Sequence, residues 1–420
     1  MQSTDPLIRT KLHLPFTRQE LVSRPRLQKQ IAQGLCGPLT LIIAPAGFGK
    51  TTLATSCIAH SGMPVAWLSL DKDDNQSGRF LTYLIAALQE ANGAIGSEAA
   101  QLIATPQQAP PESVLTSLIN DLDVTAREIV LVLDDYQCIS SQVVNELVVF
   151  LLEHQPATFH LVIATRSDPP LPLARLRARG QAVELRAADL RFTGSEAAQF
   201  LNEVMGLHLD EGLVAQLEER TEGWIAGLQM AALSMRDRKD IHGFIEGFSG
   251  TNRYILDYLL EEILSNQLPE IQHFLLYTSV LERLTAPLCD ALLASDERSE
   301  PGDQDEDSFT GLHSFHKSVS VLKHLERENL FLVSLDDERI WFRYHHLFAD
   351  LLRARLHQVQ PDLVLRLHIR AADWLEQKGL IPEAIQHLLA AHRIDRAADL
   401  IERYGFVHWA ENDLSVVQMA

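Results

Sequence analysis

The feature that most constrains the fold is a glycine-rich segment between a short apolar run and a helical pattern. The run Leu39–Ala44 leads directly into Pro45-Ala46-Gly47-Phe48-Gly49-Lys50-Thr51-Thr52, and an apolar-periodic stretch follows from Leu53 to His60. In such a turn, backbone N–H groups at a helix N-terminus cradle phosphate, a lysine reaches the β and γ oxygens, and a hydroxyl serves Mg²⁺. Ala44 takes the place of the first glycine of the usual pattern and is its smallest substitute. The segment predicts a P-loop in which Ala46, Gly47, Phe48, Gly49, Lys50, Thr51 and Thr52 contact phosphate.

Four further apolar runs rich in β-branched residues alternate with helical patterns up to about residue 190. They are Val65–Leu70, Ile129–Leu133, His160–Ala164 and Ala182–Leu185. Each run is continuous rather than alternating, as expected for parallel strands that helices cover on both faces. The pattern predicts an α/β domain with a parallel sheet.

Two of these runs end in residues that suit nucleotide chemistry. Asp134 and Asp135 follow the third run, at the strand end where open α/β sheets bind ligands. There Asp134 would hold Mg²⁺ and Asp135 could orient or deprotonate the attacking water, although both could also form a solvated acidic turn. Arg166 follows the fourth run and could read the γ-phosphate if that strand lies beside the third; otherwise it simply meets solvent. We therefore take Asp134, Asp135 and Arg166 as candidate catalytic residues, with Thr51 and Asp134 as candidate metal ligands.

The remainder of the chain is predicted to be mostly helical, with breaks near Gly206, Gly223, Gly250 and Pro269. Two short strands flanking the polar turn Asp336–Arg339 after helices are typical of the wing of a winged-helix domain. The helices beyond Pro361 are typical of the start of a helical-repeat array. The predicted domains are 1–193 (nucleotide binding), 194–284 (helical), 285–357 (winged helix) and 358–420 (helical arm).

Composition excludes several classes of protein. The 36 Lys and Arg residues against 56 Asp and Glu residues give a net charge of −20, which disfavours nonspecific DNA binding, and the segment Asp296–Ser308 is acidic enough to be a solvated loop. The four cysteines are too widely spaced for a zinc site and suit a reducing cytoplasm. We expect neither a membrane-spanning segment nor a membrane partner. The chain stops at Ala420 without a polar tail, so we expect a fragment of a longer protein.

The order of motifs resembles the N-terminal half of the STAND ATPases, which are signal-transducing P-loop NTPases of AAA+ type. The likeness is strongest to the bacterial branch of maltose-regulon activators, LuxR-type ATP-dependent regulators. Besides the P-loop, the matching segments are Thr10–Leu12, Val22–Leu27, Trp67–Asp71 with Asp74-Asn75, Leu133–Tyr136, Thr165–Pro170, Glu222–Gln229 and Tyr344–Phe348.

This resemblance implies a nucleotide-binding domain, a helical domain and a winged-helix domain that close around ADP. It implies adenine contacts from Val22 and Arg24, and a turn of the helical domain, here Gly223-Trp224-Ile225, near the nucleotide. It also implies that His345 meets the β-phosphate of ADP; a metal site at His345-His346 is the disfavoured alternative. An inducer sensor of tetratricopeptide-like repeats and a DNA-binding helix-turn-helix are implied outside this chain.

The function predicted on this basis is an ATP/ADP-dependent switch with slow ATPase activity. It would be closed with ADP, and would open and self-associate with inducer and ATP. One alternative is a constantly turning AAA+ motor, with Arg175, Arg177 and Arg179 as possible arginine fingers. Another is a nucleotide-independent scaffold, which Lys50, Thr51 and Asp134 argue against.

Overall fold

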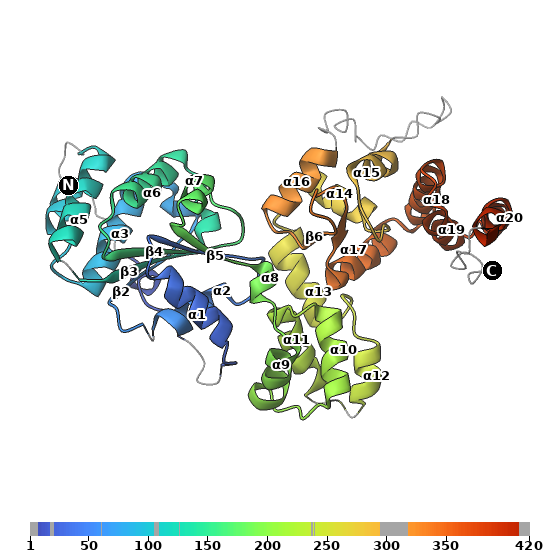
Figure 1. Ribbon diagram of the computed structural model, residues 1–420, viewed down its shortest axis with the longest axis horizontal. Coiled ribbons are helices and arrows are strands. Elements are labelled where there is room, and N and C mark those ends of the chain that lie inside the picture. Colours follow the sequence, from blue (N-terminus) through green and yellow to red (C-terminus); the bar gives the residue numbers. More distant parts are fainter. Residues whose placement is uncertain are drawn as a thin grey trace. The chain divides into compact units, whose positions relative to one another are not determined.

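The computed structural model divides into two compact units, Met1–His242 and Gly243–Ala420, and each is described by itself (Figure 1). The structure describes residues 7–16, 21–59, 61–104, 109–125, 127–236, 238, 240–294 and 318–410. The acidic segment Asp296–Ser308 and the chain end at Ala420 lie outside these residues.

The first unit contains a five-stranded parallel sheet. Its strands are β1 (Leu39–Ile43), β2 (Val65–Ser69), β3 (Ile129–Asp134), β4 (Phe159–Thr165) and β5 (Ala182–Arg186), in the order β2-β3-β4-β1-β5. The predicted parallel sheet is confirmed. Because β4 pairs with both β1 and β3, the segments that follow these three strands emerge side by side at one edge of the sheet.

Helices cover both faces of this sheet (Figure 1). One face carries α1 (Pro25–Gly34) and α2 (Lys50–Ile58), and the other carries α3 (Ser77–Ala91), α5 (Pro111–Thr125) and α6 (Gln142–His154). Strands β1, β3 and β4 are buried along their length, which explains their continuous apolar sequences. A helix that we did not expect, α4 (Ser97–Ala104), packs on α3 and α5, and α7 (Leu173–Ala178) packs beside β5.

A helical segment completes the first unit. It comprises α8 (Ala187–Leu190), α9 (Gly194–Gln199), the π-helical turn Phe200–Val204, α10 (Glu211–Thr221) and α11 (Ile225–Met235). A capping box starts α9: the Thr193 hydroxyl accepts from the Glu196 N–H, and the Glu196 carboxylate accepts from the Thr193 N–H. The turn between α10 and α11 requires glycine, because Gly223 has φ 68° and a Cβ there would lie 2.5 Å from the Phe192 carbonyl oxygen.

The second unit begins within α12 (Ile241–Glu246), which spans the boundary, and continues with helices that lead to a hairpin. The helices are α13 (Arg253–Leu259) with the π-helical turn Leu260–Leu264, α14 (Pro269–Thr278), α15 (Ala286–Leu293) and α16 (Ser318–Arg327). Strands β6 (Leu332–Ser334) and β7 (Phe342–Tyr344) pair antiparallel, as predicted for a wing, and α17 (His346–Val359) follows. The Asp336 carboxylate accepts from the N–H groups of Ile340 and Trp341 and thereby shapes the turn.

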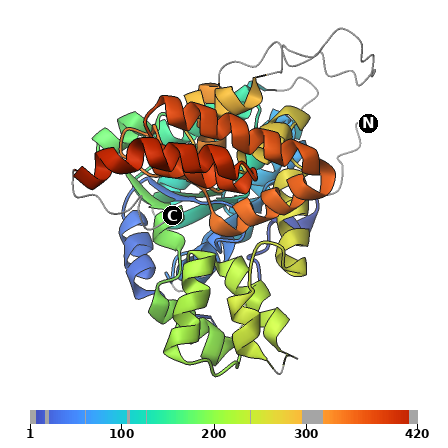
Figure 2. The same ribbon diagram turned by 90° about the vertical axis from the view of Figure 1, so that its right-hand side faces the viewer.

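Three helices end the described chain: α18 (Pro361–Gln377), α19 (Ile381–Ala390) and α20 (Ile394–Ala410). Each packs against the next, as Figures 1 and 2 show. Ala372, Ile381, Ile385 and Leu388 contribute to their shared apolar core, and Gly379 (φ 76°) lies in the turn between α18 and α19. None of the described helices combines the length and apolar character that crossing a bilayer requires.

Candidate nucleotide-binding site

The turn between β1 and α2 has the backbone conformation of a phosphate cradle. Gly47 (φ 77°) and Gly49 (φ 75°) both adopt the left-handed conformation, and α2 begins immediately afterwards at Lys50. The Lys50 ammonium is folded back over the turn and donates to the carbonyl oxygens of Ala44 at 2.9 Å and Pro45 at 3.0 Å. The sequence thus places a cation and a helix N-terminus at the same point, a combination that attracts phosphate.

Two predicted metal ligands are in direct contact beside this turn. The Thr51 hydroxyl, in the first turn of α2, donates to the Asp134 carboxylate at the end of β3, at 2.9 and 3.1 Å from its two oxygens. Asp134 is only 3% exposed. A hydroxyl and a carboxylate are oxygen donors of the kind that Mg²⁺ prefers, so this pair fits the cation. Mg²⁺ bound here would be held by Thr51 and Asp134.

Burial favours the neutral forms of Lys50 and Asp134. Burial, with a smaller contribution from the Arg166 charge, lowers the pKa of Lys50 to about 8. Burial, with a smaller contribution from Asp135, raises the pKa of Asp134 to about 6. A bound anion would stabilise the charged form of Lys50, and a bound cation that of Asp134, so both shifts favour ligands of opposite charge.

The other two candidate catalytic residues lie on adjacent strand ends, joined by a glutamine that sequence analysis missed. Asp135 follows β3 with φ 57°, and Arg166 follows β4. The Gln137 amide donates to Asp135 Oδ1 at 2.8 Å and accepts from the backbone N–H of Arg166 at 3.0 Å. Its sequence position, three residues beyond Asp134, carried no signal, because the bond to Arg166 spans 29 positions.

A cavity of about 310 Å³ adjoins the start of α2 and is lined by both apolar and polar side chains. Val22 and Arg24, the predicted adenine contacts, are among its lining residues, with Gly49 and Thr52. The lining residues that sequence analysis missed include Cys57, Phe192, Phe200 and Gln229, whereas Ile225 belongs to the turn that was expected near the nucleotide. A cavity that offers both apolar walls and polar groups next to a phosphate cradle suits a flat aromatic base.

Arg24 has a more definite structural role than the sequence suggested. Its guanidinium donates to the carbonyl oxygens of Leu190 at 2.8 Å and Arg191 at 2.9 Å, and pairs with Glu196 at 3.2 Å. It also lies over the Phe192 ring, 4.9 Å from its centroid. Arg24 therefore fixes the segment that leads into the helical part of the unit, and its predicted contact with adenine stays a prediction.

The turn Gly223–Ala226 is hydrogen-bonded to the P-loop itself. The Trp224 indole N–H donates to the Ala46 carbonyl oxygen at 3.1 Å, and the Ala226 N–H donates to the Gly47 carbonyl oxygen at 3.0 Å. Trp224 is fully buried. These two hydrogen bonds join the backbone of the cradle directly to the start of α11.

Two family models match the chain. The model of the ATPase family associated with various cellular activities (AAA) matches residues 40–186. These residues include the five strands of the parallel sheet except Leu39, the first residue of β1. The model of the MalT winged helix domain matches residues 260–364, which include the β6–β7 hairpin and α17. The chain is a MalT-like P-loop ATPase.

Curated relatives of this MalT-like ATPase are substantially longer than the chain. It is 34% identical over 414 residues to the HTH-type transcriptional regulator MalT of Yersinia pestis, covering 98% of this chain and 44% of that protein. It is 33% identical over 403 residues to the serine/threonine-protein kinase PknK of Mycobacterium tuberculosis, covering 95% of this chain and 34% of that protein. The chain therefore spans less than half the length of either relative.

Among solved structures, a Walker-type ATPase of Pyrococcus abyssi has the same fold. The TM-score is 0.54 at 18% sequence identity, and the match covers 81% of this chain and 98% of the other. This similarity supports the P-loop fold of the MalT-like ATPase.

In the winged-helix region of the MalT-like ATPase, the two neighbouring histidines face different surroundings. His345 directly precedes α17, is 2% exposed, and lies edge-on to Phe331 with ring centroids 5.4 Å apart. His346 is exposed. His345 belongs to the second unit, and its contact with the β-phosphate stays a prediction.

Proposed function

We propose that this chain is the core of a nucleotide-dependent switch that hydrolyses ATP slowly. ADP holds the resting form, and inducer together with ATP opens the protein and permits self-association. Hydrolysis then resets the switch. Because a transcriptional regulator matches over 98% of this chain, we propose that the output of the switch is control of transcription.

The observation that carries this proposal is the pair of hydrogen bonds from Trp224 and Ala226 to the P-loop carbonyl groups. A ligand shifts a conformational equilibrium only if it binds the two states with different affinity. The Gly223–Ala226 turn touches the same backbone that would cradle phosphate. The geometry thus supports a helical segment that responds to the phosphates of the bound nucleotide.

Within the site, each residue has a distinct proposed task. Lys50 and the N–H groups of the P-loop bind the β- and γ-phosphates, and Thr51 and Asp134 hold Mg²⁺. Mg²⁺ would supply neutralisation of phosphate charge. Asp135 orients the attacking water and takes its proton, while Arg166 reads the γ-phosphate. Val22 and Arg24 line the base cavity, and His345 donates to the β-phosphate of ADP in the resting form.

The decisive experiment identifies the nucleotide that the purified protein carries and measures how fast it turns over. The protein is denatured, the released nucleotide is identified by chromatography, and ATP hydrolysis is followed without inducer. Bound ADP and slow turnover are expected. Fast turnover would favour a motor, and no nucleotide with no affinity for ATP would favour a scaffold.

Two of the three candidate arginine fingers, Arg175 and Arg177, weaken the motor alternative. Arg175 pairs with Glu153, and Arg177 pairs with Glu184. Both arginine side chains already have carboxylate partners within the chain, so a role in a neighbouring subunit would require these pairs to separate.

A further inference from the structure

Gln137 connects the segments that follow two neighbouring strands. Its side-chain amide donates to Asp135 Oδ1 at 2.8 Å and accepts from the Arg166 N–H at 3.0 Å. Asp135 and Arg166 are the residues proposed to act on the attacking water and on the γ-phosphate. A single amide therefore joins the two strand ends on which hydrolysis depends.

The direction of this amide is fixed by its partners. A backbone N–H can only donate, so the oxygen of the Gln137 amide must face Arg166. The NH₂ group then faces Asp135, whose Oδ1 accepts the hydrogen bond. A flipped amide would place oxygen against carboxylate and nitrogen against N–H, which would lose both bonds.

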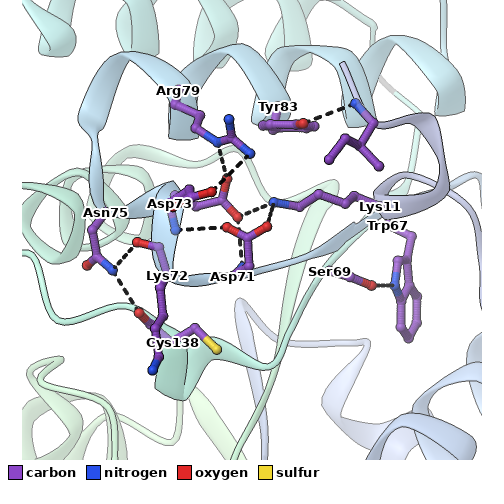
Figure 3. A network of polar contacts seen from close by, with 12 residues as sticks. Lys11, Trp67, Ser69, Asp71, Lys72, Asp73, Asn75, Arg79, Tyr83 and Cys138 are labelled. Carbon is purple, nitrogen blue, oxygen red and sulfur yellow. Dashed lines mark hydrogen bonds and ion pairs between the residues drawn. The ribbon is translucent and has the colours of Figure 1, made fainter. Parts of the chain in front are cut away.

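The loop that carries Gln137 is anchored from both sides. Asp135 adopts a left-handed conformation at φ 57°, and the buried Tyr136 hydroxyl donates to Asn145 Oδ1 at 2.8 Å. On the other side, the Asn75 amide donates to the Cys138 carbonyl oxygen at 2.8 Å, as Figure 3 shows, and accepts from the N–H groups of Ser140 and Ser141 at 2.7 Å.

A charged cluster anchors the short 3-10 helix that ends at Asn75 (Figure 3). Asp71 begins the short 3-10 helix Lys72–Asn75 with a capping box, and Lys11 pairs with Asp71 at 3.0 Å and with the fully buried Asp74. Arg79 pairs with Asp74 at 3.3 Å. A loop fixed in this way gives Gln137 a defined position relative to the strand ends.

From this arrangement we infer that Gln137 is a positioning residue for ATP hydrolysis; the inference rests on the proposed role of Asp135. In the reaction, the water oxygen bonds to the γ-phosphorus and the bond to the bridging oxygen breaks, leaving its electron pair on ADP. The water proton passes to Asp135. Gln137 restrains rotation of the Asp135 carboxylate and keeps it in register with Arg166, so that the proton acceptor and the γ-phosphate contact stay aligned.

The test compares three variants in single-turnover hydrolysis of ATP, in equilibrium binding of ADP, and in binding of ADP with aluminium fluoride. Gln137→Leu removes both bonds. Gln137→Glu keeps an acceptor for the Arg166 N–H but places a like charge beside Asp135. Gln142→Leu is the matched control, because the exposed Gln142 also donates to a carboxylate, Glu146, at 2.8 Å.

Gln137→Leu is expected to slow hydrolysis about ten- to hundredfold and to weaken the aluminium fluoride complex by a similar factor, with ADP affinity unchanged. Gln137→Glu should also be slow, because a carboxylate at this position cannot donate to Asp135 Oδ1 and the bond that restrains Asp135 is lost. Gln142→Leu should behave as the parent protein.

Three results would overturn the inference. The first is normal hydrolysis by Gln137→Leu, and the second is an equal loss of ADP affinity and hydrolysis rate in that variant. The third is a Gln137→Glu variant with full activity, since the bond to Asp135 would then be dispensable. The variant Asp135→Asn distinguishes failure of the inference about Gln137 from failure of the proposed role of Asp135. If Asp135→Asn hydrolyses ATP normally, the proposed role of Asp135 fails as well. If Asp135→Asn is inactive while Gln137→Leu is as active as the parent protein, only the inference about Gln137 fails.

Discussion

At the residue scale, the burial of Lys50 makes nucleotide binding sensitive to alkaline pH. With its pKa lowered to about 8, the ammonium is charged below pH 8 and loses its proton above it. Affinity for ADP should therefore fall as pH rises through about 8, because the neutral amine attracts phosphate less. Calorimetric titration of ADP at several pH values measures this. In Lys50→Arg the guanidinium keeps its charge, so the fall should disappear even if affinity is lower throughout.

Removing the Lys50 cation altogether measures how much it contributes to the affinity for nucleotide. A hydrogen bond to a charged group contributes about 1.5 to 3 kcal/mol, so Lys50→Ala should lose at least one to two powers of ten in affinity for ADP and ATP. Lys29→Ala, an exposed lysine on α1, is the control. Unchanged affinity in Lys50→Ala would contradict the P-loop assignment.

Asp134 should act through the metal rather than on the nucleotide directly. We expect Asp134→Asn to spare most of the ADP affinity and to remove the Mg²⁺ dependence of ATP binding, because its amide is a poor ligand for a hard cation. In the parent protein this dependence should weaken as pH falls through about 6, where the Asp134 carboxylate takes up a proton. Titrating ATP with and without Mg²⁺ checks both effects. A variant that still needs Mg²⁺ to the same degree would assign the cation to other ligands.

At the element scale, the parts of the site that are local in sequence could be predicted. Strand β1, the P-loop turn and α2 are consecutive, and continuous apolar runs gave all five strands. The expectation that Arg166 lies near Asp134 required only that β4 be adjacent to β3, which the pairing of Ile129 with Phe159 through Leu133 with Ile163 confirms.

Contacts between distant segments could not be predicted in the same way. The Trp224–Ala46 bond joins residues 178 positions apart, and the base cavity draws its lining from the N-terminal segment, α2 and the helical segment. In the sequence, nothing distinguishes Gln137 from an ordinary loop residue. Only the fold brings the backbone N–H of Arg166 to its amide oxygen. Helix α4 is only eight residues long, so packing on α3 and α5 decides its formation.

The contact between α11 and the P-loop yields a prediction with a closely matched control. Trp224→Phe keeps an aromatic ring but leaves the Ala46 carbonyl without its donor, at a cost of about 1 to 3 kcal/mol. Both the affinity for ADP and the thermal stability of the first unit should fall in Trp224→Phe. Trp67→Phe is the control, because Trp67 is also buried but donates to Ser69 at 3.0 Å (Figure 3). Calorimetric titration and thermal unfolding of both variants check this. Equal losses of ADP affinity in the two variants would show that Trp224 acts only through stability.

At the scale of the whole molecule, two compact units can respond separately to ligand. A nucleotide raises the free energy of unfolding only of a unit that it contacts, by about 2.7 kcal/mol at a hundred times its Kd. If the P-loop alone bound ADP, ADP would raise the unfolding temperature of the first unit and leave the second unchanged. If His345 also donates to the β-phosphate, both units should gain stability.

Unfolding with and without ADP therefore tests the proposed resting form. His345→Ala should abolish the effect of ADP on the second unit while leaving its effect on the first. It should also speed release of a fluorescent ADP analogue by about one to two powers of ten, since a hydrogen bond to a charged group is lost from the bound state only. Because His345 is 2% exposed, the variant will also be less stable on its own; the difference between measurements with and without ADP removes that contribution. His346→Ala, at the exposed neighbour, should change neither quantity. Faster release from His346→Ala alone would assign the contact to that residue, and an unchanged second unit in the parent protein would mean that ADP does not lock the two units through His345.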